Sequence, residues 1–332
     1  MSIFVSDNNK VVMKFESGLY ASPSGTSGLW LGLVTNSEIS ENQGVMEIRY
    51  AGTSNRNVSQ FVDGPQDYEG TLTYHPQNWR MLGFALGSIT FTSGATSNTH
   101  TLSEVNSDDS YAFTSGTLNP FASFTIVDEW KGTADGKHQL RQYKGCIVDS
   151  FNLSASEGEV VECEVGYRAQ SMTLGSKTAD IVNIADEDTN RPYIWSDIKV
   201  NIPSGTKFDS VKEIGFTINN NLEQKHYLNG SRTQAIAVPL NRDYELTVTA
   251  DAESTLGNTM YNNYWNGGST FNVLLEGVIS ANKNIYISLS GCKLTSFGAP
   301  SPAEGVNEYS MTIKANSCSA IAKDTLPNYN PW

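Results

Sequence analysis

Two stretches decide the fold of this chain: DYEGTLTY at residues 67–74 and DYELTVTA at residues 243–250. In both, apolar and polar side chains alternate, and a period of two is what a half-buried β-strand requires. The first stretch belongs to a segment, residues 37–75, that can be laid without a gap on residues 213–251. Arg56 then meets Arg232 at the same offset of 176 residues (232 − 56 and 243 − 67). The sequence therefore predicts one strand-rich unit that occurs twice.

Later landmarks follow in the same order in each copy. GCIVDSF at 145–151 answers GCKLTSF at 291–297, and Glu-Gly at 157–158 answers Glu-Gly at 304–305. From Asp67 to Gly145 is 78 residues and from Asp243 to Gly291 is 48, so the first copy carries about 30 extra residues. We place them at roughly 90–119, a stretch rich in Ser, Thr and Gly. An excursion of this length is usually functional or disordered.

Helix candidates follow the matched strands, at residues 76–87 and 252–265, with Gly at the end of each. Further strands are expected at 146–153, 160–167, 285–289, 293–297 and 308–314. We therefore predict an all-β fold with minor helix: two tandem β-sandwich or open-barrel units, each with a flanking helix. The first unit spans residues 1–190 with its insertion near 90–120, and the second spans 191–332. Residues 175–191, which contain Asp186-Glu187-Asp188, read as a solvated acidic linker.

Charge is lopsided, with 35 acidic against 22 basic residues and a formal charge of −13. This balance argues against a protein that grips phosphate backbones, because such binding uses Lys and Arg. The N-terminus lacks a basic region followed by an apolar core, and no stretch approaches the roughly 18 apolar residues of a membrane span. We expect a soluble product, made in the cytoplasm, without a signal peptide. The four cysteines are expected to be buried free thiols, since Cys146 and Cys292 occupy matching positions.

Motifs of catalysis and metal binding are missing. The four histidines are scattered, and the sequence has no phosphate-binding Gly-rich loop, GxSxG or HExxH. The acidic run at 186–188 lacks the spacing of a calcium loop. We predict no enzymatic activity, no cofactor and no metal; a hydrolase with dispersed carboxylates is the minor alternative.

Matched charged residues are the best site candidates. By alternation Asp67, Glu69, Asp243 and Glu245 point away from the core. They form either an ordinary solvated strand edge or an acidic surface that repels DNA when repeated around an assembly. Arg56 and Arg232 each follow a turn, which suits an exposed loop residue or an inter-subunit ion pair.

The segment EIGFTINNNLE at 213–223, followed by Arg232, Val238-Pro239 and YELTVT at 244–249, resembles the major tail tube proteins of long-tailed viruses of bacteria and archaea. The likeness is clearest over residues 195–315. The first half resembles the same family more loosely, through Trp30-Leu31-Gly32, Arg56, the strand at Asp67 and residues 145–169.

The resemblance implies a structural virion protein whose units pack edge to edge into rings, stacked as a tube for viral DNA. Six units usually surround the lumen, so two units per chain suggest three chains per ring; a six-chain ring with the second unit outside is the alternative. The expected partners are other copies of the chain, the tape measure protein and the tail terminator or tip proteins, with DNA passing through unbound. We expect the four carboxylates to face the lumen and the insertion at 90–120 to contact the next ring.

A carbohydrate-binding or adhesin protein is the rival interpretation, because acidic, aromatic-rich β-sandwiches also suit sugar recognition. Tyr261, Tyr264 and Trp265 could form a stacking platform for a sugar. They also lie where the second helix candidate packs, which favours core aromatics.

Overall fold

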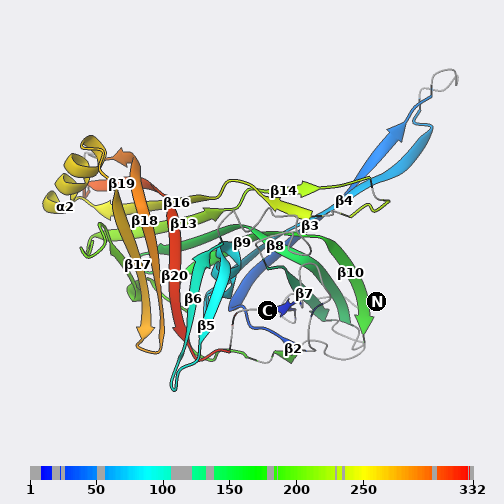
Figure 1. The fold of residues 1–332 in the computed structure, drawn as a ribbon, viewed down its shortest axis with the longest axis horizontal. Coiled ribbons are helices and arrows are strands. Elements are labelled where there is room, and N and C mark those ends of the chain that lie inside the picture. The colour runs from blue at the N-terminus through cyan, green and yellow to red at the C-terminus, as the bar shows by residue number, and fades with distance from the viewer. Residues whose placement is uncertain are drawn as a thin grey trace.

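A curved sheet of 16 strands organises the chain, and the hairpin of β3 and β4 projects from it (Figure 1). The computed structural model describes residues 9–16, 23, 27–50, 57–105, 122–131, 138–177, 183–184, 186–228, 230–233, 236–300, 305–327 and 329. Every pair of named strands is antiparallel except the two-residue pair of β2 with β11. The predicted all-β class with minor helix and antiparallel pairing is confirmed, but neighbours such as β4 and β9 are not consecutive in the chain, so the sheet is not a simple meander.

The elements of residues 1–190 are β1 (Lys10–Phe15), β2 (Ser27–Gly28), β3 (Leu33–Ile48), β4 (Gln60–His75), α1 (Arg80–Leu86), β5 (Gly87–Thr92), β6 (Asn98–Glu104), β7 (Phe124–Lys131), β8 (His138–Ser156), β9 (Glu162–Ala169), β10 (Ser171–Lys177) and β11 (Asn183–Ile184). Those that follow are the 3-10 helix η3 (Trp195–Asp197), β12 (Ile198–Asn201), β13 (Val211–Asn219), β14 (Leu222–Lys225), β15 (Ile236–Pro239), β16 (Asp243–Asp251), α2 (Ser254–Thr259), the π-helix η4 (Met260–Asn266), β17 (Phe271–Ser280), β18 (Lys283–Gly298), β19 (Glu308–Ala315) and β20 (Ser317–Asp324).

Strand order repeats along the sheet. The path β3-β4-β9-β8 is followed directly by β13-β16-β19-β18. The register repeats too: Tyr68 lies opposite Ala169 where β4 meets β9, and Tyr244 lies opposite Ala315 where β16 meets β19. At the start of each Gly-Cys landmark the glycine is left-handed, with φ of 66° at Gly145 and 61° at Gly291. This conformation is open to glycine at no steric cost.

The gapless alignment of 37–75 with 213–251 is wrong by one residue over its first strand. Ile39 lies opposite Gly70, and Phe216 lies opposite Leu246. Leu246 follows Gly70 by 176 residues (246 − 70), but Phe216 follows Ile39 by 177 (216 − 39). The segment between the paired strands is therefore one residue longer in the first half of the chain, which identity matching alone did not reveal.

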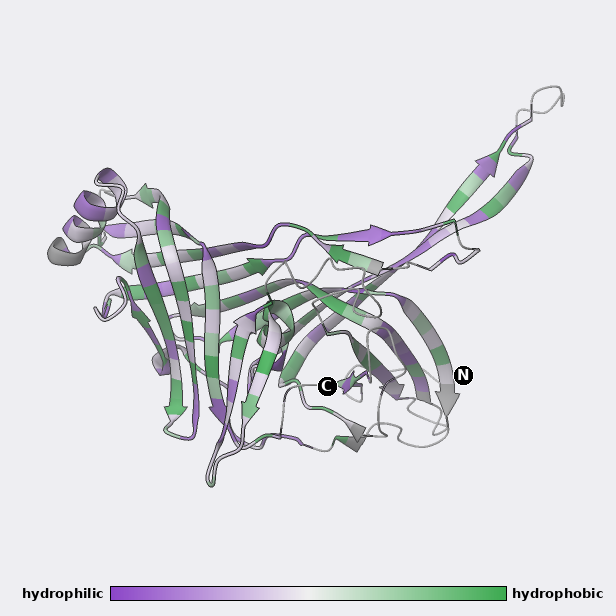
Figure 2. Ribbon diagram, in the orientation of Figure 1, coloured by the Kyte–Doolittle hydropathy of each residue, from purple (hydrophilic) through white to green (hydrophobic). Residues whose placement is uncertain are grey.

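Alternation along the strands builds the core. Ile214, Phe216 and Ile218 of β13 are buried, and the residues between them are more exposed. Figure 2 shows the same alternation of hydrophobic and hydrophilic residues along most strands. One cluster of buried apolar side chains runs through both halves of the chain. Burial of apolar area of this kind is the main favourable term in folding.

Both helix predictions are confirmed in place but not at their starts. α1 begins at Arg80 rather than Pro76, and Gly87, with φ of 99°, ends it while donating its N–H to the Gly83 carbonyl. The whole helix is buried. In the second half α2 begins at residue 254 and continues as η4 to residue 266.

The predicted excursion at 90–119 is partly regular structure. β5 and β6 form a hairpin, and β6 pairs with β20. His100 and Leu102 of β6 are fully buried, so deleting residues 90–120 would remove core as well as surface. Residues 106–119 lie outside the described part of the chain.

Candidate assembly interface

The four carboxylates singled out by the sequence lie on one face of the sheet. Asp67 and Glu69 belong to β4, and Asp243 and Glu245 belong to β16. Residues at alternate positions on these strands, such as Leu246, are buried in the core. The carboxylates therefore lie on the face opposite the core, and their orientation toward a lumen stays a prediction.

This face, which we call the polar face, carries both signs of charge. Glu69 forms an ion pair with Arg168 of β9, and Arg168 also contacts Asp149 at 3.0 Å. Glu245 lies opposite Lys314 in the register of β16 with β19. Glu69 lies opposite Arg168 in the register of β4 with β9, so a basic residue lies beside the glutamate in both places. The polar face is therefore a mixed surface rather than a purely acidic one.

The two matched aspartates bind groups from the loops around β14 and β15. His226 Nε2 lies 2.8 Å from Asp67 Oδ1. Asp243 Oδ2 accepts a hydrogen bond of 3.2 Å from Asn221 Nδ2. Sequence reasoning missed His226 and Arg168 because no spacing rule connects them to their partners; Arg168 could have been found as the counterpart of Lys314.

Arg232 joins the second half of the chain to the first. Its guanidinium contacts the Asp63 carboxylate at 3.0 Å and donates to the Gly64 carbonyl at 2.9 Å. Its own carbonyl accepts from the Gln66 N–H at 2.8 Å. Arg232 thus makes an intrachain ion pair. Arg56 lies outside the described residues, and its inter-subunit role stays a prediction.

The two halves meet through a continuous strand pairing. β13 pairs with the end of β8 in a register that runs from Glu213 opposite Ser156 to Asn219 opposite Ser150. We call this pairing the internal junction. It makes the last strand of the first set the neighbour of the first strand of the second set.

A buried asparagine anchors the internal junction. Asn220 is 1% exposed, and its amide donates to the carbonyls of Ala85, at 3.1 Å, and Val148, at 3.0 Å. Its backbone N–H donates to the Asp149 carbonyl at 2.7 Å, and its Oδ1 accepts from Arg242 Nε at 2.8 Å. Because every polar atom has a partner, the amide can be buried without a large desolvation penalty.

The hairpin of β14 and β15 extends the internal junction. Leu222 and Ala237 form a small buried cluster with Ile147 of β8. The Leu222 N–H donates to Asp149 Oδ1 at 2.8 Å. The second half therefore covers the first with a strand edge, a buried amide and an apolar contact.

Two strand edges are open at the ends of this arrangement. Within the described residues β3 pairs only with β4, and the part of β18 from Lys293 to Gly298 pairs only with β19. These strands correspond to β13 and to the end of β8, the two that join at the internal junction. An unpaired edge presents free N–H and C=O groups and is a template for another chain.

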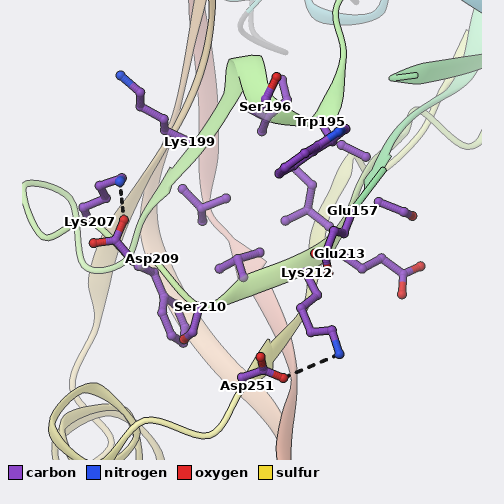
Figure 3. A pocket seen from close by; sticks show the side chains of 17 residues that line it. Glu157, Trp195, Ser196, Lys199, Lys207, Asp209, Ser210, Lys212, Glu213 and Asp251 are labelled. Carbon is purple, nitrogen blue, oxygen red and sulfur yellow. Dashed lines mark ion pairs between the residues drawn. The ribbon is translucent and has the colours of Figure 1, made fainter. Parts of the chain in front are cut away.

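A hollow of about 400 Å³ lies beside the internal junction (Figure 3). Two of its lysines are paired: Lys207 pairs with Asp209, and Lys212 contacts Glu308 at 2.8 Å and Asp251 at 3.5 Å. The Glu308 hydrogen bond, with both carboxylates nearby, raises the pKa of Lys212. The hollow therefore contains ion pairs between surface side chains.

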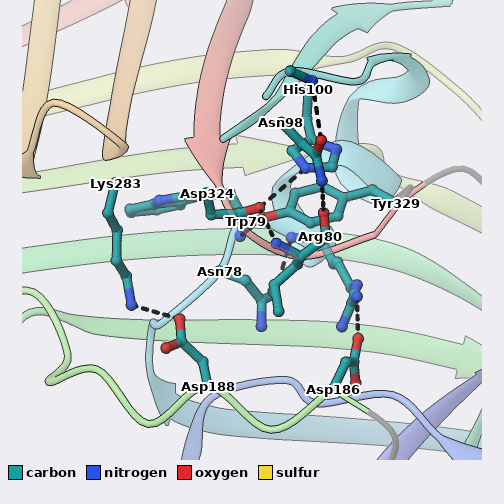
Figure 4. A network of polar contacts seen from close by, with 12 residues as sticks. Asn78, Trp79, Arg80, Asn98, His100, Asp186, Asp188, Lys283, Asp324 and Tyr329 are labelled. Atoms are coloured by element: carbon teal, nitrogen blue, oxygen red, sulfur yellow. Dashed lines mark hydrogen bonds and ion pairs between the residues drawn. The ribbon is translucent and has the colours of Figure 1, made fainter. Parts of the chain in front are cut away.

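The acidic run at 186–188 is not a solvated linker, which corrects the sequence prediction. Asp186 forms a buried ion pair with Arg80 of α1, and Asp188 forms one with Lys283 of β18 at 2.6 Å (Figure 4). Local charge patterns cannot reveal such burial, because the partners lie about a hundred residues away.

The same region holds the C-terminal Tyr329. Its buried ring stacks on His100 with ring centroids 3.6 Å apart, and its hydroxyl hydrogen-bonds to Asp324 (Figure 4). His100 Nε2 lies 3.1 Å from Asp324 Oδ1. This network ties the end of the chain to the β5–β6 hairpin.

The suggested sugar platform is split. Tyr264 packs on Phe271 with ring centroids 4.6 Å apart, as expected of a core aromatic. Tyr261 and Trp265 remain 47% and 42% exposed. Among the described residues no group of three or more His, Cys, Asp or Glu could hold a metal, and no described helix is long and apolar enough to cross a membrane.

Comparison with protein families decides the class. The family model described as phage tail tube protein matches residues 7–321, nearly the whole chain. The chain belongs to the phage tail tube protein family. A search of curated proteins finds no match. Tail tube proteins are structural components of the virion tail, so the open sheet edges become the natural candidates for assembly contacts in this tail tube protein.

Proposed function

We propose that this tail tube protein polymerises into stacked rings that form a channel for viral DNA. The observation that carries the proposal is the pair of open edges on β3 and β18, whose counterparts β13 and β8 are already joined inside the chain. A contact between unlike edges that closes on itself gives a ring, and stacking of rings gives a filament.

Three chains per ring follow if the two halves act as equivalent units around a pseudo-sixfold axis. An internal duplication explains this equivalence. It is supported by the repeated strand order, the repeated register and the matched left-handed glycines. We assign residues 1–190 and 191–332 to the two units, which share one core.

In this assembly the polar face, with Asp67, Glu69, Asp243 and Glu245, lines the lumen. Support comes from its polarity and from the opposite face being buried in the core. The net charge of −13 opposes adhesion of a phosphate polymer, while the positive charges of Arg168 and Lys314 reduce the negative potential near the glutamates. The excursion at 90–120 contributes to the contact between rings, and the tape measure, terminator and tip proteins are the other partners in the virion.

Electron microscopy of the purified chain tests this function. The protein is concentrated, incubated, and imaged in negative stain while light scattering follows its size. Hollow tubes or stacked rings are expected, with three chains per ring in class averages. A protein that stays monomeric under all conditions tried, or tubes whose cryo-EM map places the polar face on the outer wall, would contradict the corresponding part of the proposal.

A further inference from the structure

The projecting part of the β3–β4 hairpin carries apolar side chains that are more than half exposed. We call residues 43–48 and 60–66 the arm; it extends away from the sheet in Figures 1 and 2. Val45 and Met46 are each 53% exposed, and Phe61 is 65% exposed. Exposed apolar side chains gathered on one element mark an interaction surface.

Strand register identifies the counterparts of these side chains. In the arm, Val45 lies opposite Asp63 and Glu47 lies opposite Phe61. In the β14–β15 hairpin, Leu222 lies opposite Pro239 and Gln224 lies opposite Ala237. With the offsets of 177 and 176 already established, Val45 occupies the place of Leu222, and Phe61 occupies the place of Ala237. Leu222 and Ala237 are the residues buried against Ile147 at the internal junction.

The receiving surface has a counterpart as well. β8 and β18 share the same irregularity against their neighbours, between Val148 and Ser150 in β8 and between Leu294 and Ser296 in β18. Lys293 therefore occupies the place of Ile147. Lys293 is exposed, whereas Ile147 is fully buried.

The exchanged residues remain chemically compatible. A lysine stem offers apolar surface, and its ammonium is attracted to an aromatic face, so Lys293 suits the larger Phe61 as Ile147 suits Ala237. In the proposed contact Gln43 takes the position that Asn220 has at the internal junction, and it also carries an amide. Thr295 takes the position of Asp149 and also offers an oxygen acceptor.

We propose that the arm of one copy and the adjoining edge of β3 bind the second half of another copy, in the register of the internal junction. Asn42 then lies opposite Ser296 of the other copy, and Ser40 lies opposite Gly298. Val45 and Phe61 cover Lys293. The proposal rests on the proposed function, and it names the partner surface and the pairing residue by residue.

The contact is directional, because one copy contributes β3 and the next contributes β18. Its geometry repeats that of the internal junction, where β13 meets β8. Repetition of one rotation at every junction closes a ring rather than leaving an open chain, provided that the rotation divides a full turn.

Disulfide trapping tests the register. Both Asn42 and Ser296 are exposed in the chain, and the four natural cysteines are buried. Oxidation of N42C/S296C with diamide should yield covalent dimers and then closed trimers on a non-reducing gel, because paired strands bring the Cα atoms within disulfide range. N219C/S150C is the positive control. It should form a disulfide within one chain, so its two engineered thiols disappear while the protein still runs as a monomer on the gel. E38C/S296C, four residues out of register and so about 13 Å away, should cross-link poorly.

Two substitutions test the apolar contact. F61S and V45S should raise the protein concentration needed for assembly by about tenfold or more, because each removes apolar surface that would cover Lys293 of the other copy. The unfolding midpoint of the soluble chain should not change, since both side chains are exposed there. L174S is the matched control: Leu174 on β10 is 55% exposed and lies outside the arm.

The outcomes separate this proposal from the proposed function. If wild-type tubes form but N42C/S296C does not cross-link and F61S assembles normally, the pairing is wrong and the tube function stands. If cross-linked oligomers form without tubes or rings, the pairing stands and the tube function fails. If the largest cross-linked species on the gel contains six chains, the pairing stands, and a ring of six chains replaces the ring of three.

Discussion

Replacing Lys283 with Met should destabilise the chain strongly, because it leaves the buried carboxylate of Asp188 without its positively charged partner. The side chains of Lys283 and Asp188 are only 7% and 3% exposed, and Nζ lies 2.6 Å from Oδ2. The other oxygen of Asp188 is occupied by Asn190, whose N–H and amide donate to it at 2.8 and 2.6 Å. Asp188 Oδ2 would therefore have no described partner after the substitution.

Removing one member of a buried ion pair costs about 3–5 kcal/mol. For a chain of this size the loss corresponds to a fall in unfolding temperature of about 4–7 °C. Urea denaturation at pH 7, followed by circular dichroism, measures the difference in free energy of unfolding. K207M is the matched control, since Lys207 pairs with Asp209 at the surface, where both side chains are more than half exposed; it should cost less than about 1 kcal/mol.

The double variant D188N/K283M gives the sharper test. Removing the charge of Asp188 should recover about half of the loss or more, because a neutral buried amide is cheaper than an unpaired carboxylate. A K283M loss below about 1 kcal/mol, or a double variant no more stable than K283M, would refute this reasoning.

Three further predictions concern the same folded chain. N220A should lower the free energy of unfolding by about 2–4 kcal/mol, because it orphans two buried carbonyls and a donor from Arg242; a urea midpoint equal to wild type would contradict this. Burial opposes ionisation of Asp197, but the Arg191 guanidinium and the Ile194 N–H outweigh it and hold the pKa of Asp197 below its usual value. A depressed carboxyl pKa adds stability above about pH 4 that is lost as the pH falls through the folded-state pKa, so R191M should be less stable than wild type by up to about 1 kcal/mol at pH 7 and equal to it at about pH 2. Burial raises the pKa of all four cysteine thiols, that of Cys292 to about 11, so Ellman's reagent at pH 8 should find no reactive thiol in the folded chain and four in urea.

The sequence by itself determined the identity of the main strands. Alternation at 67–74 and 243–250 is a local property, since successive side chains of a strand point to opposite faces whatever lies beyond them. The end of the first helix at Gly87 could be predicted in the same way, because a left-handed conformation at that position favours glycine. The polar face carrying Asp67 and Glu245 followed from the same local pattern, whereas the buried thiols were predicted from the matching positions of Cys146 and Cys292.

Only the tertiary structure decided the register, the burial of isolated charges and the edges left open. The one-residue shift between 37–42 and 214–219 depends on hydrogen bonds to a partner strand, and slipping by one would turn every side chain to the other face. The partners of Asp186 and Asp188 lie far away in sequence, so their burial could not be read from an acidic run. β3 and β18 have strand sequences like any other. Among the described residues β3 and the Lys293–Gly298 part of β18 each keep one unpaired edge, while β13 and the end of β8 pair with each other. This difference is a property of how the whole chain folds, because an edge is defined by the absence of a neighbour rather than by the residues it contains.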